Sequence, residues 1–288
     1  MYAPSFDYYR AGSLAEAQKL LQQHPGAKVL AGGHSLIPLL KLRLTAPPAL
    51  IDIGRIPELK GITASDGTIR IGALTTHAEL ASSPALKSGS PILSEAAAQI
   101  GDAQVRNCGT IGGNVAHADP ASDLPTVLLA LEARFTAIGP KGERTIAAGD
   151  FFRGMMATAL GEHEILAAIE VPAKKPGVGM AYAKFVHPAS RYAVVGAAAV
   201  IATKDGACTA AKVAIGGLLP AASRARAVEA ALVGARPSPD TIAKAADLVS
   251  KDLGADVLGD LFASAVYRRA MAAVFVRRAL TTAFTRAT

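Results

Sequence analysis

The stretch AKVLAGGHSLIPLLKLRL, residues 27–44, places two glycines, a histidine and a serine at the edge of a predicted strand. Residues 28–30 form the strand, and a helix-like segment follows Ser35. Glycine has no Cβ, so its backbone N–H groups can approach a ligand closely and positive φ is accessible. Successive N–H groups in such a turn form a concave anion site. The stretch is therefore typical of a strand edge that binds an anionic group.

A second glycine-rich run, RNCGTIGGNVAHADPASDLP, occupies residues 106–125. It has neither the GxxxxGK[ST] pattern of a P-loop nor GxGxxG at a strand-to-helix junction, and the first run also lacks both. Two such runs with hydroxyl and amide side chains favour a pyrophosphate held from two sides. Spacing alone leaves two purely structural turns as the alternative. The residues in question are Ser35, Gly109, Thr110, Gly112, Gly113 and Asn114.

Length and composition limit the class of protein. The chain has 288 residues, 51% of them hydrophobic, which favours a well-buried globular protein with two or three domains. Its longest apolar stretch, residues 194–202, is far shorter than the ~20 residues of a membrane-spanning helix. The N-terminus lacks a basic region followed by an apolar core, so no secretory signal is predicted. We expect a cytoplasmic protein.

Cysteine, histidine and charge patterns argue against several kinds of site. Cys108 and Cys208 stand far apart with no CxxC, so this chain alone predicts no iron–sulfur cluster and no structural zinc. Cys108 is interpreted as a small buried filler. The formal net charge of +7 is compatible with nucleic acid, an acidic partner or an anionic cofactor. Arg268 and Arg277 lie roughly 2.5 helical turns apart and face opposite sides, so a DNA-reading helix is disfavoured.

Periodicity and turn signals predict helices and strands that change in order along the chain. The predicted helices are 12–23 with Ser13 at the N-cap, 91–100, 124–132 with Asp123 at the N-cap, 225–232, 240–253 and 261–284. The predicted strands are 28–30, 50–53, 68–72, 135–138, 145–147, 181–185, 193–203 and 209–215. Residues 173–179 have the composition of a linker. Beyond them, strands precede helices, which predicts an α+β unit with a three-stranded sheet.

The two runs AGGHSLIPLLKLR and RNCGTIGGNVAHADPASDLP closely resemble the two FAD-binding signatures of the medium subunits of molybdenum hydroxylases. This family includes carbon monoxide dehydrogenase and the FAD domain of xanthine dehydrogenase, and the resemblance covers nearly the whole chain. It implies an α+β fold with a two-part FAD-binding domain of the vanillyl-alcohol-oxidase (PCMH) type at residues 1–176, subdivided near 55–60. A smaller C-terminal domain of the carbon monoxide dehydrogenase flavoprotein type is implied for residues 177–288.

The resemblance also implies which residues bind FAD. The first loop, against the pyrophosphate, comprises Lys28, Val29, Leu30, Ala31, Gly32, Gly33, His34 and Ser35. The second loop comprises Thr110, Ile111, Gly112, Gly113 and Asn114. Four further residues match single positions: Asp123 an acidic FAD contact, Leu166 a backbone contact near the flavin ring, Lys184 a lysine close to the flavin, and Tyr192 a tyrosine that covers the ring. No catalytic residue and no metal ligand is implied.

The family works as an electron chain, so the resemblance implies a function within a complex. FAD on this chain would accept electrons from [2Fe–2S] clusters of a small iron–sulfur subunit and pass them to a quinone, NAD or a similar acceptor. A large subunit with molybdopterin would oxidise the substrate, such as CO, an aldehyde, a purine or an N-heterocycle, in an (αβγ)₂ assembly. The expected location is cytoplasmic, with contact to the inner face of the membrane through the acceptor as an option, but with no membrane span.

Two other functions remain open from the sequence. A self-sufficient FAD oxidoreductase of the same superfamily would need its own proton donor in the C-terminal half. Glu229, Asp240 and Asp256 there are interpreted as solvated residues, which disfavours this function. A non-enzymatic basic module that binds nucleic acid is supported by the net charge alone.

Overall fold

The strand of the opening stretch forms one edge of a small parallel sheet with order β1-β3-β2 in the computed structural model, which describes residues 2–287. The elements of this first unit are β1 (Asp7–Arg10), α1 (Leu14–Gln23), β2 (Lys28–Leu30), α2 (Leu36–Lys41) and β3 (Ala49–Asp52). Helix α1 begins as predicted, because Ser13 accepts a hydrogen bond from the Glu16 N–H at 3.2 Å. The Glu16 carboxylate accepts from the Gly12 N–H, one residue before the position that a capping box would use.

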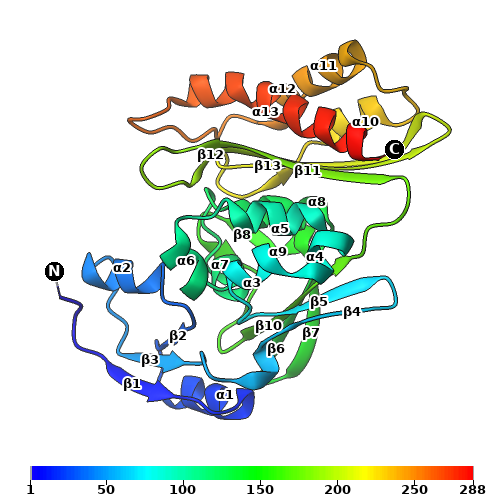
Figure 1. The fold of residues 1–288 in the computed structure, drawn as a ribbon. Helices are drawn as coiled ribbons and strands as arrows, with labels where there is room; N and C mark the ends of the chain where they lie inside the picture. The colour runs from blue at the N-terminus through cyan, green and yellow to red at the C-terminus, as the bar shows by residue number, and fades with distance from the viewer. Residues whose placement is uncertain (1, 288) are drawn as a thin grey trace.

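The second unit contains an antiparallel five-stranded sheet with order β4-β5-β10-β6-β7, covered by short helices (Figure 1). Its strands are β4 (Ile62–Ser65), β5 (Thr68–Gly72), β6 (Arg134–Gly139), β7 (Gly142–Ala147) and β10 (Ile165–Pro172), with a small pair β8 (Phe152–Gly154) and β9 (Ala157–Thr158). Its helices are η1 (Pro57–Leu59), α3 (His77–Ser82), α4 (Pro84–Gly89), α5 (Pro91–Ala98), α6 (Ala103–Cys108), α7 (Ile111–His117), α8 (Asp123–Ala130) and α9 (Ala148–Phe151).

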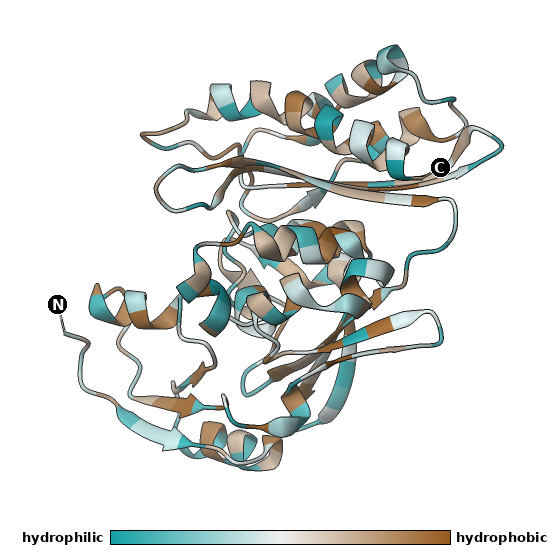
Figure 2. Ribbon diagram, in the orientation of Figure 1, coloured by the Kyte–Doolittle hydropathy of each residue, from teal (hydrophilic) through white to brown (hydrophobic). Residues whose placement is uncertain are grey.

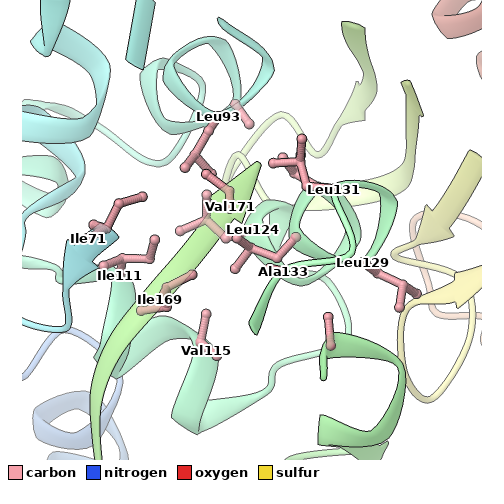
Figure 3. Packing of buried hydrophobic residues seen from close by; sticks show 14 of the residues in the cluster. Ile71, Leu93, Ile111, Val115, Leu124, Leu129, Leu131, Ala133, Ile169 and Val171 are labelled. Atoms are coloured by element: carbon pink, nitrogen blue, oxygen red, sulfur yellow. The ribbon is translucent and has the colours of Figure 1, made fainter. Parts of the chain in front are cut away.

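The core of the second unit lies between this sheet and its helices. Ile71, Ile169 and Val171 from the sheet point toward Leu93 and Leu124 on the helices (Figure 3). All five side chains are at most 1% exposed. Burial of each such side chain contributes about 1.5–3 kcal/mol relative to exposure. The core therefore holds α5 and α8 against the sheet. The loops that precede these two helices are held in place as a consequence.

The third unit is an α+β domain whose sheet is buried on both faces. Its strands are β11 (Val178–Val186), β12 (Ala193–Lys204), β13 (Ala207–Gly216) and β14 (Ser223–Arg224), and its helices are α10 (Arg226–Leu232), α11 (Pro239–Asp247), α12 (Val249–Asp252) and α13 (Ala265–Arg286). Helices α10–α13 cover one face of the sheet, and α5 and α8 of the second unit lie under the other (Figure 1). Burial on both faces explains why β12 reads as a nearly unbroken apolar run.

Successive residues of β12 belong to different cores. Ala197, Ala199 and Ile201 pack with the C-terminal helices, whereas Ala198 packs with the core of the second unit. The helices above the sheet carry both hydrophobic and hydrophilic residues along their length (Figure 2), because only their lower faces are buried. The second and third units therefore share one sheet as a wall.

Several predicted element boundaries differ from the structure. The C-terminal sheet has four strands, since the two-residue β14 pairs with β13. The predicted helix 240–253 is divided at Leu248 into α11 and α12. The predicted helix 261–284 begins only at Ala265, because Ser264 caps it and the Asp260 carboxylate accepts bonds from the two N–H groups of Phe262 and Ala263. In residues 260–263 the Asp260 carboxylate thus accepts the N–H hydrogen bonds that backbone carbonyls would accept in a helix.

Three expectations about single residues were wrong. Asp123 does not cap α8; Ser122 occupies the N-cap position and Asp123 is the first helical residue. Cys108 is exposed and fills no core, whereas Cys208 is buried. Glu229 is buried, not solvated, because its carboxylate accepts bonds from Arg224 at 2.5 Å and from the Val213 N–H at 2.8 Å.

Contact between β11 and α13 depends on Gly179. A Cβ at this position would lie 1.8 Å from the Ala283 carbonyl oxygen and 2.6 Å from the Ala287 nitrogen. We expect Gly179→Ala to lower the free energy of unfolding by at least about 2 kcal/mol, because backbone atoms of α13 must move away. Urea denaturation measures the loss. Gly149→Ala is the control, since a Cβ there meets nothing within 4 Å. Equal stability of the two variants would contradict the close approach.

Candidate functional site

A cleft of about 920 Å³ lies where the three units meet. The first unit contributes the loop after β2, the second contributes the loop before α7 and the segment before β10, and the third contributes residues 190–192. This volume falls within the range of small-molecule and cofactor sites. A site shared by three units is formed only when all of them are in place.

The loop after β2 presents free backbone donors to this cleft. Gly33 has φ +74°, a conformation that glycine adopts without strain. The backbone N–H groups of residues 32–35 donate to no protein acceptor within the described part of the chain. Because these residues line the cleft, four adjacent amides are available to an anion there.

Gly32 allows the first loop to touch the second. A Cβ at Gly32 would lie 2.0 Å from the carbonyl oxygen of Cys108 and 3.0 Å from the Cα of Gly109. These are backbone atoms, which cannot rotate away as a flexible side chain can. The absence of a side chain at Gly32 therefore sets the distance between the two loops.

The second loop uses its amides differently from the prediction. The Ile111 N–H donates to Thr75 O at 2.9 Å, and the Gly112 N–H donates to Ala73 O at 2.8 Å. The Gly113 N–H donates to the Thr110 hydroxyl, which is the N-cap of α7. The expectation that both glycine runs offer free backbone N–H groups is therefore correct for the first loop only. The glycines of the second allow close packing: a Cβ at Gly112 would lie 2.4 Å from the Cβ of Ala73.

Asn114 supplies a polar side chain to the cleft from the second loop. Its Oδ1 accepts a hydrogen bond from the Ser122 hydroxyl at 2.7 Å. This bond holds the amide group, and its Nδ2 donates to no protein group among residues 2–287. The second loop thus offers a held side-chain donor where the first offers backbone donors.

Asp123 lies at the start of α8, lines the cleft and is 3% exposed. Its Oδ1 accepts from the Tyr182 hydroxyl at 2.6 Å, and its Oδ2 accepts from Lys184 Nζ at 2.8 Å. Burial raises the pKa of Asp123, and the ammonium and hydroxyl of its two partners oppose this rise. Lys184 itself does not line the cleft, because its wholly buried side chain lies behind Asp123.

His77 is a cleft residue that sequence reasoning did not select. It opens α3 and is 3% exposed, and its Nδ1 has no hydrogen-bond partner among the described residues. Burial, followed by the nearby His34 and Arg106, lowers the pKa of His77 to about 4. The imidazole is therefore neutral at physiological pH. No local pattern marks His77 as a cleft residue, since TTHAEL resembles an ordinary helix start.

Tyr192 lies in the loop between β11 and β12, at the boundary between the cleft and a second, smaller cavity of about 400 Å³. Burial of its phenol and the nearby Asp119 raise the pKa of Tyr192, while Ser35 of the first loop lowers it. The loop is closed by the bond from His187 N–H to Tyr192 O at 2.9 Å. Tyr192 is 40% exposed and reaches the cleft from the third unit.

Most of the residues selected from the sequence surround this one cleft. Those that line it are Lys28, Val29, Ala31, Gly32, Gly33, His34, Ser35, Thr110, Gly112, Gly113, Asn114, Asp123, Leu166 and Tyr192. Leu30, Ile111 and Lys184 do not line it: Ile111 belongs to the core of the second unit, and Lys184 lies behind Asp123. Cleft residues that were not selected include His77, His117, Met156 and Ser190. His117 is part of the second glycine run, so its position there was an available signal.

The lowered pKa of His77 predicts a loss of stability in acid. An unfolded histidine binds a proton below about pH 6.5, whereas folded His77 does so only near pH 4. As pH falls through this window the unfolded state takes up the proton first, so stability decreases by up to about 3 kcal/mol and then levels off. We expect His77→Asn to remove this part of the pH dependence in urea denaturation of the FAD-free chain.

The control for this prediction is His163→Asn, since the His163 side chain is 25% exposed. That variant should retain the pH dependence of the wild type between about pH 6.5 and pH 4. If His77→Asn and wild type lose the same stability over that window, His77 is not a buried neutral imidazole.

Comparisons with known proteins agree with this architecture. A family model described as "FAD binding domain in molybdopterin dehydrogenase" matches residues 4–174, and one described as "CO dehydrogenase flavoprotein C-terminal domain" matches residues 180–283. The carbon monoxide dehydrogenase medium chain of Hydrogenophaga pseudoflava is 41% identical over 289 residues, covering 99% of each chain.

Solved structures give the same result. A carbon monoxide dehydrogenase from Hydrogenophaga pseudoflava that lacks the Mo-pyranopterin moiety superposes with a TM-score of 0.96 at 43% identity, covering 99% of both chains. Quinoline 2-oxidoreductase from Pseudomonas putida 86 superposes with a TM-score of 0.94 at 33% identity, covering 100% of this chain and 99% of that one. The chain therefore belongs to the family of FAD-binding medium subunits of molybdenum hydroxylases, and is an oxidoreductase subunit whose own cofactor is FAD.

Proposed function

We propose that this chain is the electron-transferring subunit of a molybdenum hydroxylase complex. Its FAD receives electrons from [2Fe–2S] clusters of a small partner subunit and passes them to an external acceptor. Oxidation of the substrate takes place on a large molybdopterin-containing subunit, in an (αβγ)₂ assembly. The observation that carries the proposal is the cleft between three units, with four unpaired amides at residues 32–35 on one wall.

The residues of the cleft fit FAD in their chemistry. The free amides of residues 32–35 suit the negatively charged diphosphate. The Asn114 amide and the Asp123 carboxylate offer a donor and an acceptor to hydroxyl groups. Bound FAD supplies the redox chemistry, since flavins exchange electrons both singly and in pairs.

The remaining residues bind, orient and shield the cofactor. Tyr192, from the third unit, is proposed to cover the flavin ring and to exclude water from it, and Leu166 to contact it through the backbone. The buried and neutral His77 adds no charge beneath the two loops. None of these roles requires a proton-transferring dyad.

The choice of substrate is assigned to the partner subunit. Relatives that share this fold over nearly their whole length have names with different substrates, carbon monoxide and quinoline. Because the medium subunit keeps the same fold in complexes named for different substrates, we assign the choice of substrate to another subunit. No helix among residues 2–287 is long and apolar enough to cross a membrane.

The alternative of a self-sufficient FAD oxidoreductase requires a proton donor near the cleft in the C-terminal half. Glu229 is engaged by Arg224 and Arg226, and Asp240 by Lys244 at the surface. The alternative of a basic nucleic-acid module requires a free basic face. Arg268 is instead buried and donates to the Gly217 carbonyl at 2.7 Å. Neither alternative has a specific observation in its favour.

The experiment that tests the proposal combines FAD titration with spectroscopy of the native complex. The FAD-free chain is expected to bind one FAD per chain, measured by flavin fluorescence. The complex isolated under mild conditions should add iron–sulfur absorption and contain molybdenum. NADPH should not rapidly reduce the flavin of the isolated chain. Rapid turnover with NADPH and a small substrate would favour the self-sufficient enzyme, and absence of FAD binding would contradict the proposal.

The contact at Gly32 gives a second test. We expect Gly32→Ala to reduce FAD affinity at least tenfold, because its Cβ would displace the second loop through the Cys108 carbonyl. The measurement is the FAD-to-chain ratio after gel filtration, together with a titration of the FAD-free chain. Gly149→Ala, in open space, should retain wild-type FAD content. Full FAD content in Gly32→Ala would show that the distance between the loops does not control binding.

A further inference from the structure

Both oxygens of the Asp123 carboxylate accept hydrogen bonds from side chains on one strand of the other domain. Tyr182 and Lys184, both on β11, contact its two oxygens at 2.6 and 2.8 Å. The Lys184 side chain is 0% exposed and that of Asp123 is 5% exposed, so the ion pair is almost wholly buried and only Asp123 reaches the cleft. Lys184 Nζ also donates to the carbonyl of Gln99, at the end of α5, at 3.3 Å. The lysine thus joins three elements behind the cleft wall.

The structure makes room for this arrangement. Gly196 on β12 is paired with Lys184, and a Cβ on Gly196 would lie 2.5 Å from the Tyr182 hydroxyl. A Cβ on Gly216 of β13 would lie 2.0 Å from Thr126 Oγ1, so this glycine lets α8 approach the sheet. Gly196 is therefore needed for the position of the Tyr182 hydroxyl, and Gly216 for the close approach of α8 to the C-terminal sheet. Asp123 reaches its partners only when the sheet is docked against α8.

Burial alone would favour the neutral form of this carboxyl group. Desolvation raises the pKa of Asp123, and the charge and hydrogen bond of Lys184 are the largest opposing effects, followed by the hydrogen bond from Tyr182. Removal of one member of a buried ion pair leaves an uncompensated charge, which neutralises by taking up a proton. A protonated Asp123 would offer a hydroxyl donor in place of a carboxylate acceptor.

Other ionisable groups near α8 do not take over this role. His117 and Tyr192 line the same cleft, but the groups bonded to the Asp123 carboxylate are Tyr182 and Lys184. Asp150 on α9 and Lys204 on β12 are exposed, and other ionisable side chains on elements packed against α8 have partners elsewhere. Those pairs are Glu95 with Arg286, Lys212 with Glu132, and Arg224 with Glu132 and Glu229.

We propose that Tyr182 and Lys184 are positioning residues that keep the Asp123 carboxylate ionised and facing the cleft, so that FAD affinity depends on docking of the C-terminal sheet. Lys184 then acts on the cofactor through Asp123, in place of the direct flavin contact expected from the sequence. The inference rests on the proposed function, because it takes Asp123 as part of the FAD site. Docking of the C-terminal domain and binding of FAD are then thermodynamically coupled.

The test is the pH profile of FAD affinity in the full chain. FAD dissociation constants are measured by flavin fluorescence between about pH 5 and pH 9, where histidine and perturbed carboxyl groups titrate. In wild type, affinity should fall with decreasing pH as Asp123 is protonated. In Lys184→Met the midpoint of this fall should move upward by at least about one pH unit, which is a tenfold change in proton affinity. Lys184→Arg retains the charge and should restore the midpoint toward that of wild type.

Two further variants separate positioning from stability. Asp123→Asn should bind FAD weakly, with a flat profile over the window in which wild type titrates. Arg268→Met removes a different buried cation, whose partners Asp260 and the Gly217 carbonyl both lie in the C-terminal domain, and is the matched control. It should reduce stability and leave the midpoint unchanged. Uniformly weaker binding of Lys184→Met at every pH, or unchanged binding, would overturn the inference.

If Lys184→Met does not fold, Tyr182→Phe takes its place in the test, because it removes only one hydrogen bond to Asp123. It should shift the midpoint in the same direction by a smaller amount, and an unchanged midpoint would count against the inference. If wild type binds no FAD, the proposed function fails together with the part of the inference that concerns FAD affinity. The pKa of Asp123 from carboxyl-carbon NMR then decides the other part, that Tyr182 and Lys184 keep this carboxylate ionised. A higher pKa in Tyr182→Phe than in wild type supports it, and equal values overturn it.

Discussion

The proposed FAD site depends on the close approach of two loop backbones at Gly32. The first loop can present its amides to a cleft only if the second unit lies directly against it, and the Cys108 carbonyl lies where a side chain of residue 32 would be. The second loop is in turn fixed to the segment that follows β5, because Ile111 and Gly112 donate their N–H groups to residues 75 and 73. A rigid second loop and an open first loop thus form one site from two units.

The two glycine runs consequently have different physical roles. In the first, glycine leaves N–H groups free and permits positive φ at Gly33. In the second, glycine permits close packing of the chain on Ala73, and the amides are consumed by the protein. Free amides attract a phosphate group, whereas satisfied amides stabilise the surrounding fold. Similar glycine content in the sequence therefore corresponds to free backbone donors in one loop and to support of the fold in the other.

The boundary between the domains is not a boundary of the site. Strand β12 contributes alternate residues to the cores of both domains, and β11 holds Asp123 of the FAD-binding domain. A buried ion pair is weak evidence for stability, since desolvation offsets much of its attraction. Because Asp123 lies on the cleft wall, the ion pair is better explained by the orientation that it gives to the Asp123 carboxylate. Redox chemistry belongs to the cofactor, so the chain has to supply position, shielding and charge.

The sequence by itself determined the fold class, the family and the two glycine-rich loops that border the cleft, because glycine loops and alternating strands leave local patterns. The strand at residues 28–30, the cap at Ser13 and the sheet that follows residue 177 could all be read from neighbouring residues. Only the tertiary structure decided the roles of His77, Lys184 and Glu229. Whether a polar side chain is solvated, paired or buried depends on residues far away in the chain: Lys184 meets Asp123 across 61 positions. Local patterns carry no record of such contacts, which arise only when separate units pack together.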